Sequence, residues 1–174
     1  MSVPVTAASP PLVLDLEALY RGARDDVYAY VATLLHDASA AEEVTAQAFE
    51  RAVRRRRGYD GRRGSPRAWL FGIARNAALD ELRRRRRSAA LTAEPADVAA
   101  AAPEDEADRT LRRAAVSAAL ATLGAREREI VALKFHAGLD NAEIARVLGV
   151  SVSNAGTLLH RAMTQLREAV DARP

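Results

Sequence analysis

A stretch that cannot join a hydrophobic core divides this chain of 174 residues into two parts. Residues 88–108 carry six acidic side chains and no basic one, in a background of alanine and proline. Their only large aliphatic side chains are Leu91 and Val98, so burial cannot offset the entropy lost on ordering. We therefore predict an acidic interdomain linker at 88–108. Its acidic residues are Glu94, Asp97, Glu104, Asp105, Glu106 and Asp108.

Both flanking parts carry the period of amphipathic helices, which predicts an all-α chain with two small domains at 12–87 and 109–171. Residues 1–11 lack the basic start and long apolar core of a secretory signal, so we expect a disordered tail there. The sequence has no cysteine, which fits a reducing cytoplasm, and no spanning segment, so we expect no membrane insertion.

Three helices are expected in the first domain. Apolar side chains recur at three- and four-residue steps from Leu14 to Leu35, and a second such stripe begins near Ser39. Ser65 supplies a capping hydroxyl before a proline, so a third helix should run from there to about Arg87. The predicted buried stripes comprise Leu16, Leu19, Tyr20, Ala23, Val27, Val31 and Leu34, and then Ala41, Val44, Ala48, Phe49, Ala52 and Val53.

Arginine is concentrated in the second half of this domain. The segment 51–87 holds fourteen of the chain's twenty-five arginines and a net charge of +11, together with Tyr59, Trp69, Phe71 and Asn76. Arginines attract phosphate, whereas rings and amides stack on and hydrogen-bond to bases, so the mixture favours a nucleic acid over a membrane. The alternatives are a solvated charged helix face and, for Trp69, ordinary core packing.

The second domain carries the pattern of a helix-turn-helix. Helices are outlined by Leu111 to Leu123 and by Ile130 to Lys134. Asp140 and Glu143 then have the spacing of a capping box, Gly149 can take a left-handed turn, and Ser151 can cap the next helix. That helix is expected to bury Ala155, Leu159, Ala162, Met163, Leu166 and Val170. It would then present Ser151, Ser153, Asn154, Thr157, His160 and Arg161 to a DNA groove.

The first domain also resembles a known family. Residues 65–84, which include Trp69-Leu70-Phe71-Gly72-Ile73-Ala74-Arg75-Asn76, are similar to the promoter-melting helix of bacterial sigma factors of the extracytoplasmic-function (ECF) group in the sigma-70 family. Residues 123–170 resemble the minus-35-reading domain of the same group. The resemblance is carried there by Glu143-Ile144-Ala145, Leu148-Gly149-Val150-Ser151 and Leu159-His160-Arg161-Ala162.

The resemblance implies an initiation factor that binds core RNA polymerase, through the clamp helices of its largest subunit and its flap, and recognises promoter DNA. The polymerase-binding positions would be Glu42, Glu43, Gln47, Glu50 and Arg54. The minus-10 positions would be Tyr59, Asp60, Arg62, Arg63, Trp69, Arg75, Asn76, Arg83 and Arg84. Because the sequence ends just past Val170 and contains no apparent sensory module, we expect control by a separate anti-sigma protein. We also expect a monomer when the factor is free of polymerase, since no dimerisation helix is apparent, and poor promoter binding by the factor alone.

Three positions depart from the family pattern. Many members carry a basic residue at the places of Gly156 and Leu158, so this recognition helix should attract phosphate less strongly. An acid usual in the family is replaced by Gln47, which should alter the affinity for core polymerase.

Two other classes of function fit the sequence less well. A stand-alone helix-turn-helix regulator would bind duplex DNA without polymerase, but it needs a dimer surface and the chain has no heptad seam. An enzyme is disfavoured because the three histidines are far apart and no phosphate loop, nucleophile elbow or metal-ligand spacing occurs. We therefore expect no catalytic residue, metal or cofactor.

Overall fold

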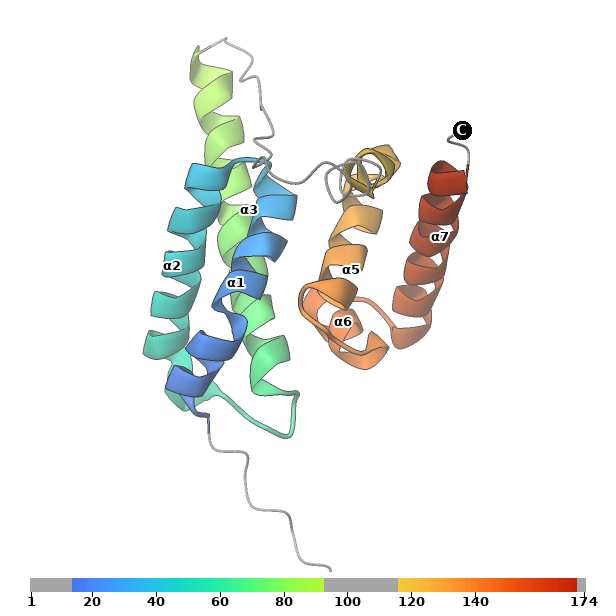
Figure 1. Cartoon of the computed structure of the whole chain (residues 1–174). Coiled ribbons are helices and arrows are strands. Elements are labelled where there is room, and N and C mark those ends of the chain that lie inside the picture. The colour runs from blue at the N-terminus through green and yellow to red at the C-terminus, as the bar shows by residue number, and fades with distance from the viewer. Residues whose placement is uncertain (1–13, 93–115, 172–174) are drawn as a thin grey trace, which may run out of the picture.

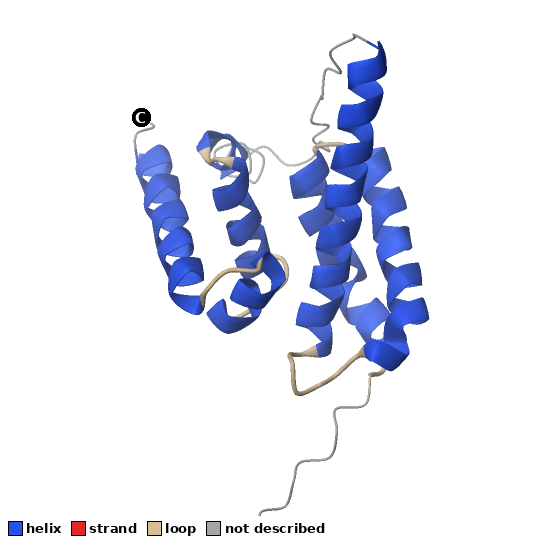
Figure 2. Cartoon of the chain, turned by 180° about the vertical axis from the view of Figure 1, so that it is seen from behind, coloured by secondary structure: helices blue, strands red, loops and turns tan. Residues whose placement is uncertain are grey.

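The computed structural model describes residues 14–92 and 116–171, and all regular structure in these ranges is helical (Figures 1 and 2). The all-α fold class is therefore confirmed. The predicted tail at 1–11 and most of the predicted linker lie outside the described residues. In chain order the elements are α1 (Leu16–Leu35), α2 (Ala38–Arg55), the 3-10 turn η1 (Arg56–Gly58), α3 (Pro66–Thr92), α5 (Ala125–Phe135), α6 (Asn141–Leu148) and α7 (Val152–Asp171), with a short helical segment at 116–122.

Each helix of the first unit, α1 to α3, begins at a side chain that satisfies a free backbone amide. Asp15 and Asp37 each accept a hydrogen bond of 2.9 Å from the amide three residues on. Ser65 does the same at the start of α3, at 3.1 Å, as its capping hydroxyl predicts. A cap of this kind contributes about 1 kcal/mol. Between α1 and α2 the chain turns at His36, whose backbone is left-handed with φ of 52°.

The core of the first unit combines a few large side chains with many alanines. Tyr30 of α1 and Phe71 of α3 are fully buried and meet edge to face, with ring centroids 5.4 Å apart. Where α2 meets α3, the buried positions are mostly alanine, which lets the two backbones approach closely. These alanines are Ala41, Ala48, Ala52, Ala74, Ala77 and Ala78.

The observed helices differ from the predicted ones in two respects. Tyr20, Val53 and Val170, placed in buried stripes by their spacing, are 46–47 % exposed, because the first two lie toward one end of the α1–α2 pair and the last lies at the end of α7. The helix α3 does not end near Arg87 but continues to Thr92, since residues 89–91 are two alanines and a leucine. Its last turns extend beyond α1 and α2 (Figure 1).

The second unit, comprising residues 116–171, contains the predicted helix-turn-helix, although Leu159, Met163 and Leu166 of the predicted buried stripe are only half-buried. Asp140 and Glu143 form a complete capping box at the start of α6. Gly149 ends α6 with φ of 67°, and the Ser151 hydroxyl accepts a hydrogen bond of 3.1 Å from the Asn154 amide at the start of α7. These three local features set the angle between the two helices of the helix-turn-helix.

The two units pack directly against each other. Helix α5 lies against α1 and α6 lies against α3, and the buried side chains of both units belong to one continuous cluster. We call this contact the seam. Periodicity within single helices gave no indication of it.

Candidate nucleic-acid interface

The loop between η1 and α3, predicted to contact minus-10 DNA, is held by its own residues. The Tyr59 hydroxyl donates a 3.0 Å hydrogen bond to the Gly64 carbonyl, and its ring meets Trp69 edge to face with centroids 5.5 Å apart. Burial raises the pKa of Tyr59, which keeps that hydroxyl protonated. Asp60 accepts a 3.0 Å hydrogen bond from the amide of Arg62 and closes the turn. Two rings and a backbone turn therefore shape the loop before any partner binds.

The structure separates two neighbouring residues predicted to bind the same DNA element. Asn76 is exposed on α3, so its amide is accessible to a base. Arg75 instead points toward the second unit, where its Nε donates to Glu129 at 2.7 Å. Trp69 is half-buried and Ile73 is buried, so the face of α3 that these two residues share with Asn76 by helical spacing is accessible only in part.

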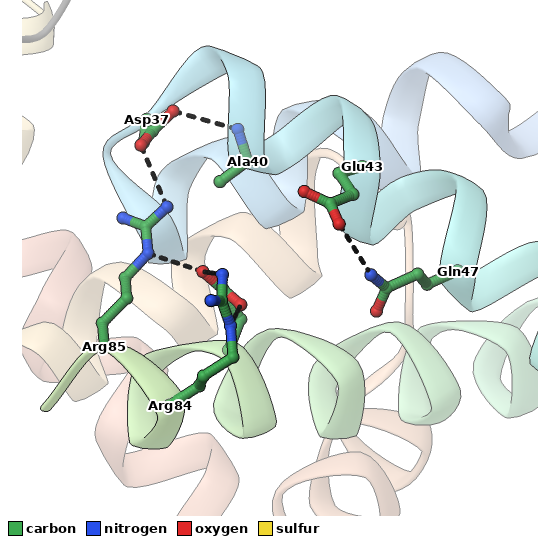
Figure 3. Close-up of polar contacts among 7 residues, drawn as sticks. Asp37, Ala40, Glu43, Gln47, Arg84 and Arg85 are labelled. Carbon is green, nitrogen blue, oxygen red and sulfur yellow. Dashed lines mark hydrogen bonds and ion pairs between the residues drawn. The ribbon is translucent and has the colours of Figure 1, made fainter. Parts of the chain in front are cut away.

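The arginine run at the end of α3 makes short-range ion pairs. Arg83 pairs with Asp80 at 3.2 Å and Arg84 with Glu81 at 2.8 Å, both one turn apart. The two arginines are exposed, so such pairs contribute little and can be exchanged for phosphate. Arg85 instead pairs with Glu81 at 2.8 Å and with Asp37, the cap of α2, at 2.9 Å. Figure 3 shows the pair with Asp37. Arg85 therefore has a structural role.

Figure 3 also shows part of the face of α2 that was predicted to bind polymerase. Gln47 donates a 3.3 Å hydrogen bond to Glu43, while Glu50 pairs with Arg54 at 2.9 Å. All five predicted residues lie on α2, four of them exposed and Gln47 half-buried. They therefore form an acidic row that remains accessible when the units are packed together. Its members are Glu42, Glu43, Gln47, Glu50 and Arg54.

The predicted DNA-reading residues of α7 are all exposed near its first turns. The helix buries Ala155 and Ala162 and packs on α5 and α6, leaving the opposite side free. The Thr157 hydroxyl donates a 3.0 Å hydrogen bond to the Ser153 carbonyl one turn earlier. The exposed set is Ser151, Ser153, Asn154, Thr157, His160 and Arg161.

At the centre of the seam lies a buried carboxylate. Glu129 of α5 is only 8 % exposed, and one of its oxygens accepts from the Tyr30 hydroxyl at 3.1 Å and from Arg75 at 2.7 Å. Burial first, and the Glu129 charge second, raise the pKa of Tyr30 well above its usual range, so its hydroxyl stays a donor. Removing one partner of such a pair leaves an uncompensated charge, which costs about 3 kcal/mol.

A second set of contacts joins the start of α3 to the helix-turn-helix. Arg67 donates to the carbonyls of His136 (3.0 Å) and Ala137 and pairs with Asp26 of α1. Helix α6 reaches the loop before α3. Arg146 donates to the Arg63 carbonyl, and the Ser65 hydroxyl donates to the Glu143 carboxylate. The loop predicted to contact minus-10 DNA is thus in direct contact with α6, the helix that precedes α7.

Sequence reasoning did not identify Tyr30, Arg67 and Glu129 as residues that join the two units. Tyr30 lies three residues after Val27, so the stripe of α1 did contain a signal for its burial. Glu129 and Arg67 look like ordinary surface charges, and their partners are far away in the sequence. No periodic pattern could have paired them.

In the described residues no helix is long and apolar enough to cross a membrane. The same residues contain no group of three or more histidine, aspartate or glutamate side chains positioned to hold a metal ion.

Comparison with known proteins decides the family. Residues 19–88 match the sigma-70 region 2 family and residues 113–166 match the sigma-70 region 4 family. The ECF RNA polymerase sigma factor SigK of Mycobacterium ulcerans is 31 % identical over 150 residues, covering 84 % of this chain and 80 % of that protein. This chain belongs to the ECF sigma factors of the sigma-70 family. The region boundaries place α1 to α3 in region 2 and α5 to α7 in region 4.

Two other relatives of this sigma factor differ in their sequence identity to it and in their length. SigL of Mycobacterium tuberculosis is 30 % identical over 153 residues, covering 87 % of this chain and 86 % of SigL. BldN of Streptomyces coelicolor is 36 % identical over 153 residues, covering 85 % of this chain, which spans only 57 % of BldN.

Two solved structures share the fold of this sigma factor. One is the sigma factor RpoE in complex with the anti-sigma factor NepR from Bartonella quintana, with a TM-score of 0.77, 20 % identity, and coverage of 92 % of this chain and 99 % of that one. The other is CnrH in complex with the cytosolic domain of CnrY, with a TM-score of 0.65, 23 % identity, and coverage of 91 % and 89 %.

Proposed function

We propose that this sigma factor binds core RNA polymerase in the cytoplasm and directs initiation at promoters that it recognises at two separate elements. The observation that carries the proposal is the placement of two exposed polar surfaces on two helical units, in the order of regions 2 and 4. One surface surrounds the loop before α3 and the other covers the start of α7. The first surface has the chemistry to bind an unpaired base, and the second has the chemistry to bind duplex DNA.

The region 2 surface suits an extruded base. Flipping a base from the stack costs a few kcal/mol, and a pocket offsets this cost by stacking and hydrogen bonding. The Tyr59–Trp69 pair forms a rigid aromatic wall beside the loop, and the exposed Asn76 amide offers a donor and an acceptor on the same helix. Arg62 and Arg63 at the loop supply phosphate attraction.

The region 4 surface suits duplex DNA. Asn154 and Arg161 are exposed on α7, where an amide can pair with adenine and a guanidinium with guanine or phosphate. Gly156 and Leu158 are both half-buried on the same helix, and Leu158 packs partly against the core, so only its exposed part could meet a thymine methyl group. The weaker phosphate attraction at these two places should make minus-35 binding depend more on base contacts.

The acidic row of α2 is the proposed contact with the clamp helices of the polymerase, and region 4 would contact the flap. The row remains accessible in the free protein, and its ion pairs, Glu50 with Arg54 and Glu42 with Arg24, lie between exposed side chains. Such pairs contribute about 0 to 1 kcal/mol and are easily replaced by pairs with a partner.

In vitro transcription with core polymerase tests this proposal. The factor is added to core enzyme on a library of genomic DNA from its host, and start sites are mapped to recover its promoters. Asn76→Ala should then impair initiation on duplex promoters much more than on templates premelted at minus-10. Arg161→Ala should weaken initiation on both templates, whereas the matched control Arg167→Ala, exposed farther along α7, should change neither.

One outcome would refute the whole proposal, and another would refute only the role given to Asn76. One is RNA synthesis that is identical with and without the factor. The other concerns Asn76 alone: equal losses for Asn76→Ala on duplex and premelted templates would remove its role in melting.

We further propose that a separate anti-sigma protein controls this factor. The support is that the similarly folded RpoE was solved with the anti-sigma factor NepR. Co-purification of the tagged factor from its native host tests this, and a factor recovered only free or bound to polymerase under all growth conditions would contradict it.

A further inference from the structure

Two cavities along the seam are lined by described residues of both units and have volumes of about 300 and 270 Å³. The larger one is lined mainly by apolar side chains. The smaller one lies between the end of α1, the second half of α3 and the start of α5, and its lining includes Arg86, Arg126 and Arg128. We call it the arginine cavity. None of these arginines belongs to the surfaces proposed to bind DNA or polymerase.

The positive charge of the arginine cavity is not balanced by neighbouring acids. Glu129 is the one acidic residue among the described residues of the lining, and its carboxylate already accepts from Arg75 at 2.7 Å. In the described parts of the chain Arg86 and Arg126 make no ion pair, whereas the three arginines before Arg86 in the same run all do. Two exposed guanidiniums without an acidic partner therefore lie at one hollow.

The third guanidinium is held in place by its neighbours. Arg128 donates from Nη2 to the Leu123 carbonyl at 2.9 Å, and its Nη1 lies 2.6 Å from Nε2 of His36. Burial first, and the charge of Arg128 second, lower the pKa of His36. Near pH 7 the imidazole is therefore neutral and accepts this hydrogen bond. Arg128 is thus oriented before any ligand binds, which reduces the entropy cost of binding.

The rest of the lining suits a ligand with an apolar body. Leu34, Leu79 and Leu82 are half-buried and form part of the walls. Ala125 lies beside them at the start of α5, whose cap residue Gly124 makes no side-chain hydrogen bond to the first amides. The positive end of the helix dipole therefore adds to the charge of the arginines. The cavity combines apolar walls with a positive rim.

We propose that the arginine cavity binds a nucleoside polyphosphate, with its phosphates on the arginines and its base against the leucines. Guanidiniums bind phosphate oxygens through paired hydrogen bonds. Three of them carry more charge than a single carboxylate neutralises, which favours a polyphosphate. The volume of about 270 Å³ is close to the lower limit of about 300 Å³ for small-ligand sites, so it admits one nucleotide, whereas a DNA duplex is too wide to enter. The proposal goes beyond the proposed function and does not depend on it.

Calorimetric titration of the full-length factor tests the class of ligand. Because leucines do not select among bases, ATP and GTP are both used. Inorganic triphosphate supplies the phosphates without the base, and adenosine and guanosine supply the base without phosphates. We expect one nucleotide to bind per chain, at least about five-fold more tightly than inorganic triphosphate or either nucleoside, because only the nucleotide uses both the rim and the walls. Equal affinities for nucleotide and inorganic triphosphate would refute the assigned class, and the absence of nucleotide binding would refute the site.

Substitutions at the rim test the location of the site. Arg86→Gln and Arg126→Gln change exposed side chains, and each should weaken nucleotide binding about ten-fold through the loss of a hydrogen bond to a charged group. The matched control is Arg87→Gln, which removes the same charge from the next residue of α3, outside the lining. It should leave the affinity nearly unchanged. Equal losses for Arg86→Gln and Arg87→Gln would show a diffuse attraction to the basic helix and would overturn the proposal.

Imidazole signals in NMR spectra give an independent readout of where the ligand binds. The chain has three histidines, of which His36 lines the arginine cavity and His160 lies on α7. Nucleotide should shift the signals of His36 and leave those of His160 unchanged. A larger shift at His160 than at His36 would contradict the proposed site. These measurements contain no polymerase and no promoter, so a failure of the proposed function would leave their results unchanged.

Discussion

Two glycines of region 4 provide a paired test of how the helix-turn-helix is built. Gly149 has φ of 67°, and a Cβ built there would meet nothing within 4 Å. Alanine at that place therefore adds backbone strain and no steric clash. An L-residue in the left-handed region costs about 1–2 kcal/mol. Gly156 lies inside α7, where a Cβ would make an ordinary 3.8 Å contact with Asn141. Alanine there gains about 0.5–1 kcal/mol of helix stability.

Gly149→Ala and Gly156→Ala should therefore shift stability in opposite directions, with a difference of about 2 kcal/mol between them. For a unit of this size each kcal/mol corresponds to about 4–8 °C in Tm. Circular dichroism follows both units, while the fluorescence of Trp69, the only tryptophan, follows region 2. Comparing the two signals shows whether the change is confined to region 4.

The result that would refute this reasoning is a shift of the same sign for both variants. Loss of stability in Gly156→Ala would mean that the contact with Asn141 is not an ordinary one. Unchanged stability in Gly149→Ala would mean that the turn adopts another backbone conformation.

Two further predictions concern stability. Burial lowers the pKa of His36 and of His136, and for His36 the charge of a neighbouring arginine lowers it further. The unfolded chain then binds protons more readily, so stability should be fully present above about pH 6.5 and decline as pH falls through the folded pKa values, seen as a falling Tm. Replacing both histidines with glutamine should flatten that decline. The Thr45 hydroxyl is buried without a hydrogen-bond partner in the described residues, so Thr45→Val should stabilise the protein by about 1 kcal/mol in denaturant titrations. Thr33→Val is the control, because it removes a 2.9 Å hydrogen bond from the Thr33 hydroxyl to the Ala29 carbonyl. It should stabilise the protein less than Thr45→Val does, or destabilise it.

The features that the sequence predicts well are local. The capping hydroxyl of Ser65, the capping box of Asp140 and Glu143 and the left-handed turn at Gly149 depend only on a few neighbouring residues, and all three are present. The exposure of the α7 residues predicted to read DNA follows from the period of the helix. Local chemistry fixes these features whatever the rest of the chain does.

The seam could not be predicted because it joins residues that no local rule relates. Tyr30 and Glu129 are 99 residues apart, and Arg75 and Glu129 are 54 apart. An arginine or glutamate on a helix is usually solvated, and its burial against another unit depends on tertiary packing alone. Burial at the ends of the helices was overestimated for a related reason, since Tyr20, Val53 and Val170 keep the helical period where the described neighbours cover them only in part.

The two cavities along the seam, of about 300 and 270 Å³, are open to solvent, so water already reaches part of the contact between the units. Thr33 of α1 lines both of them, and most of their remaining surface is apolar. Drawing the units apart would therefore newly expose less apolar surface than parting a sealed interface of the same size, and the free energy of that step should depend less on temperature.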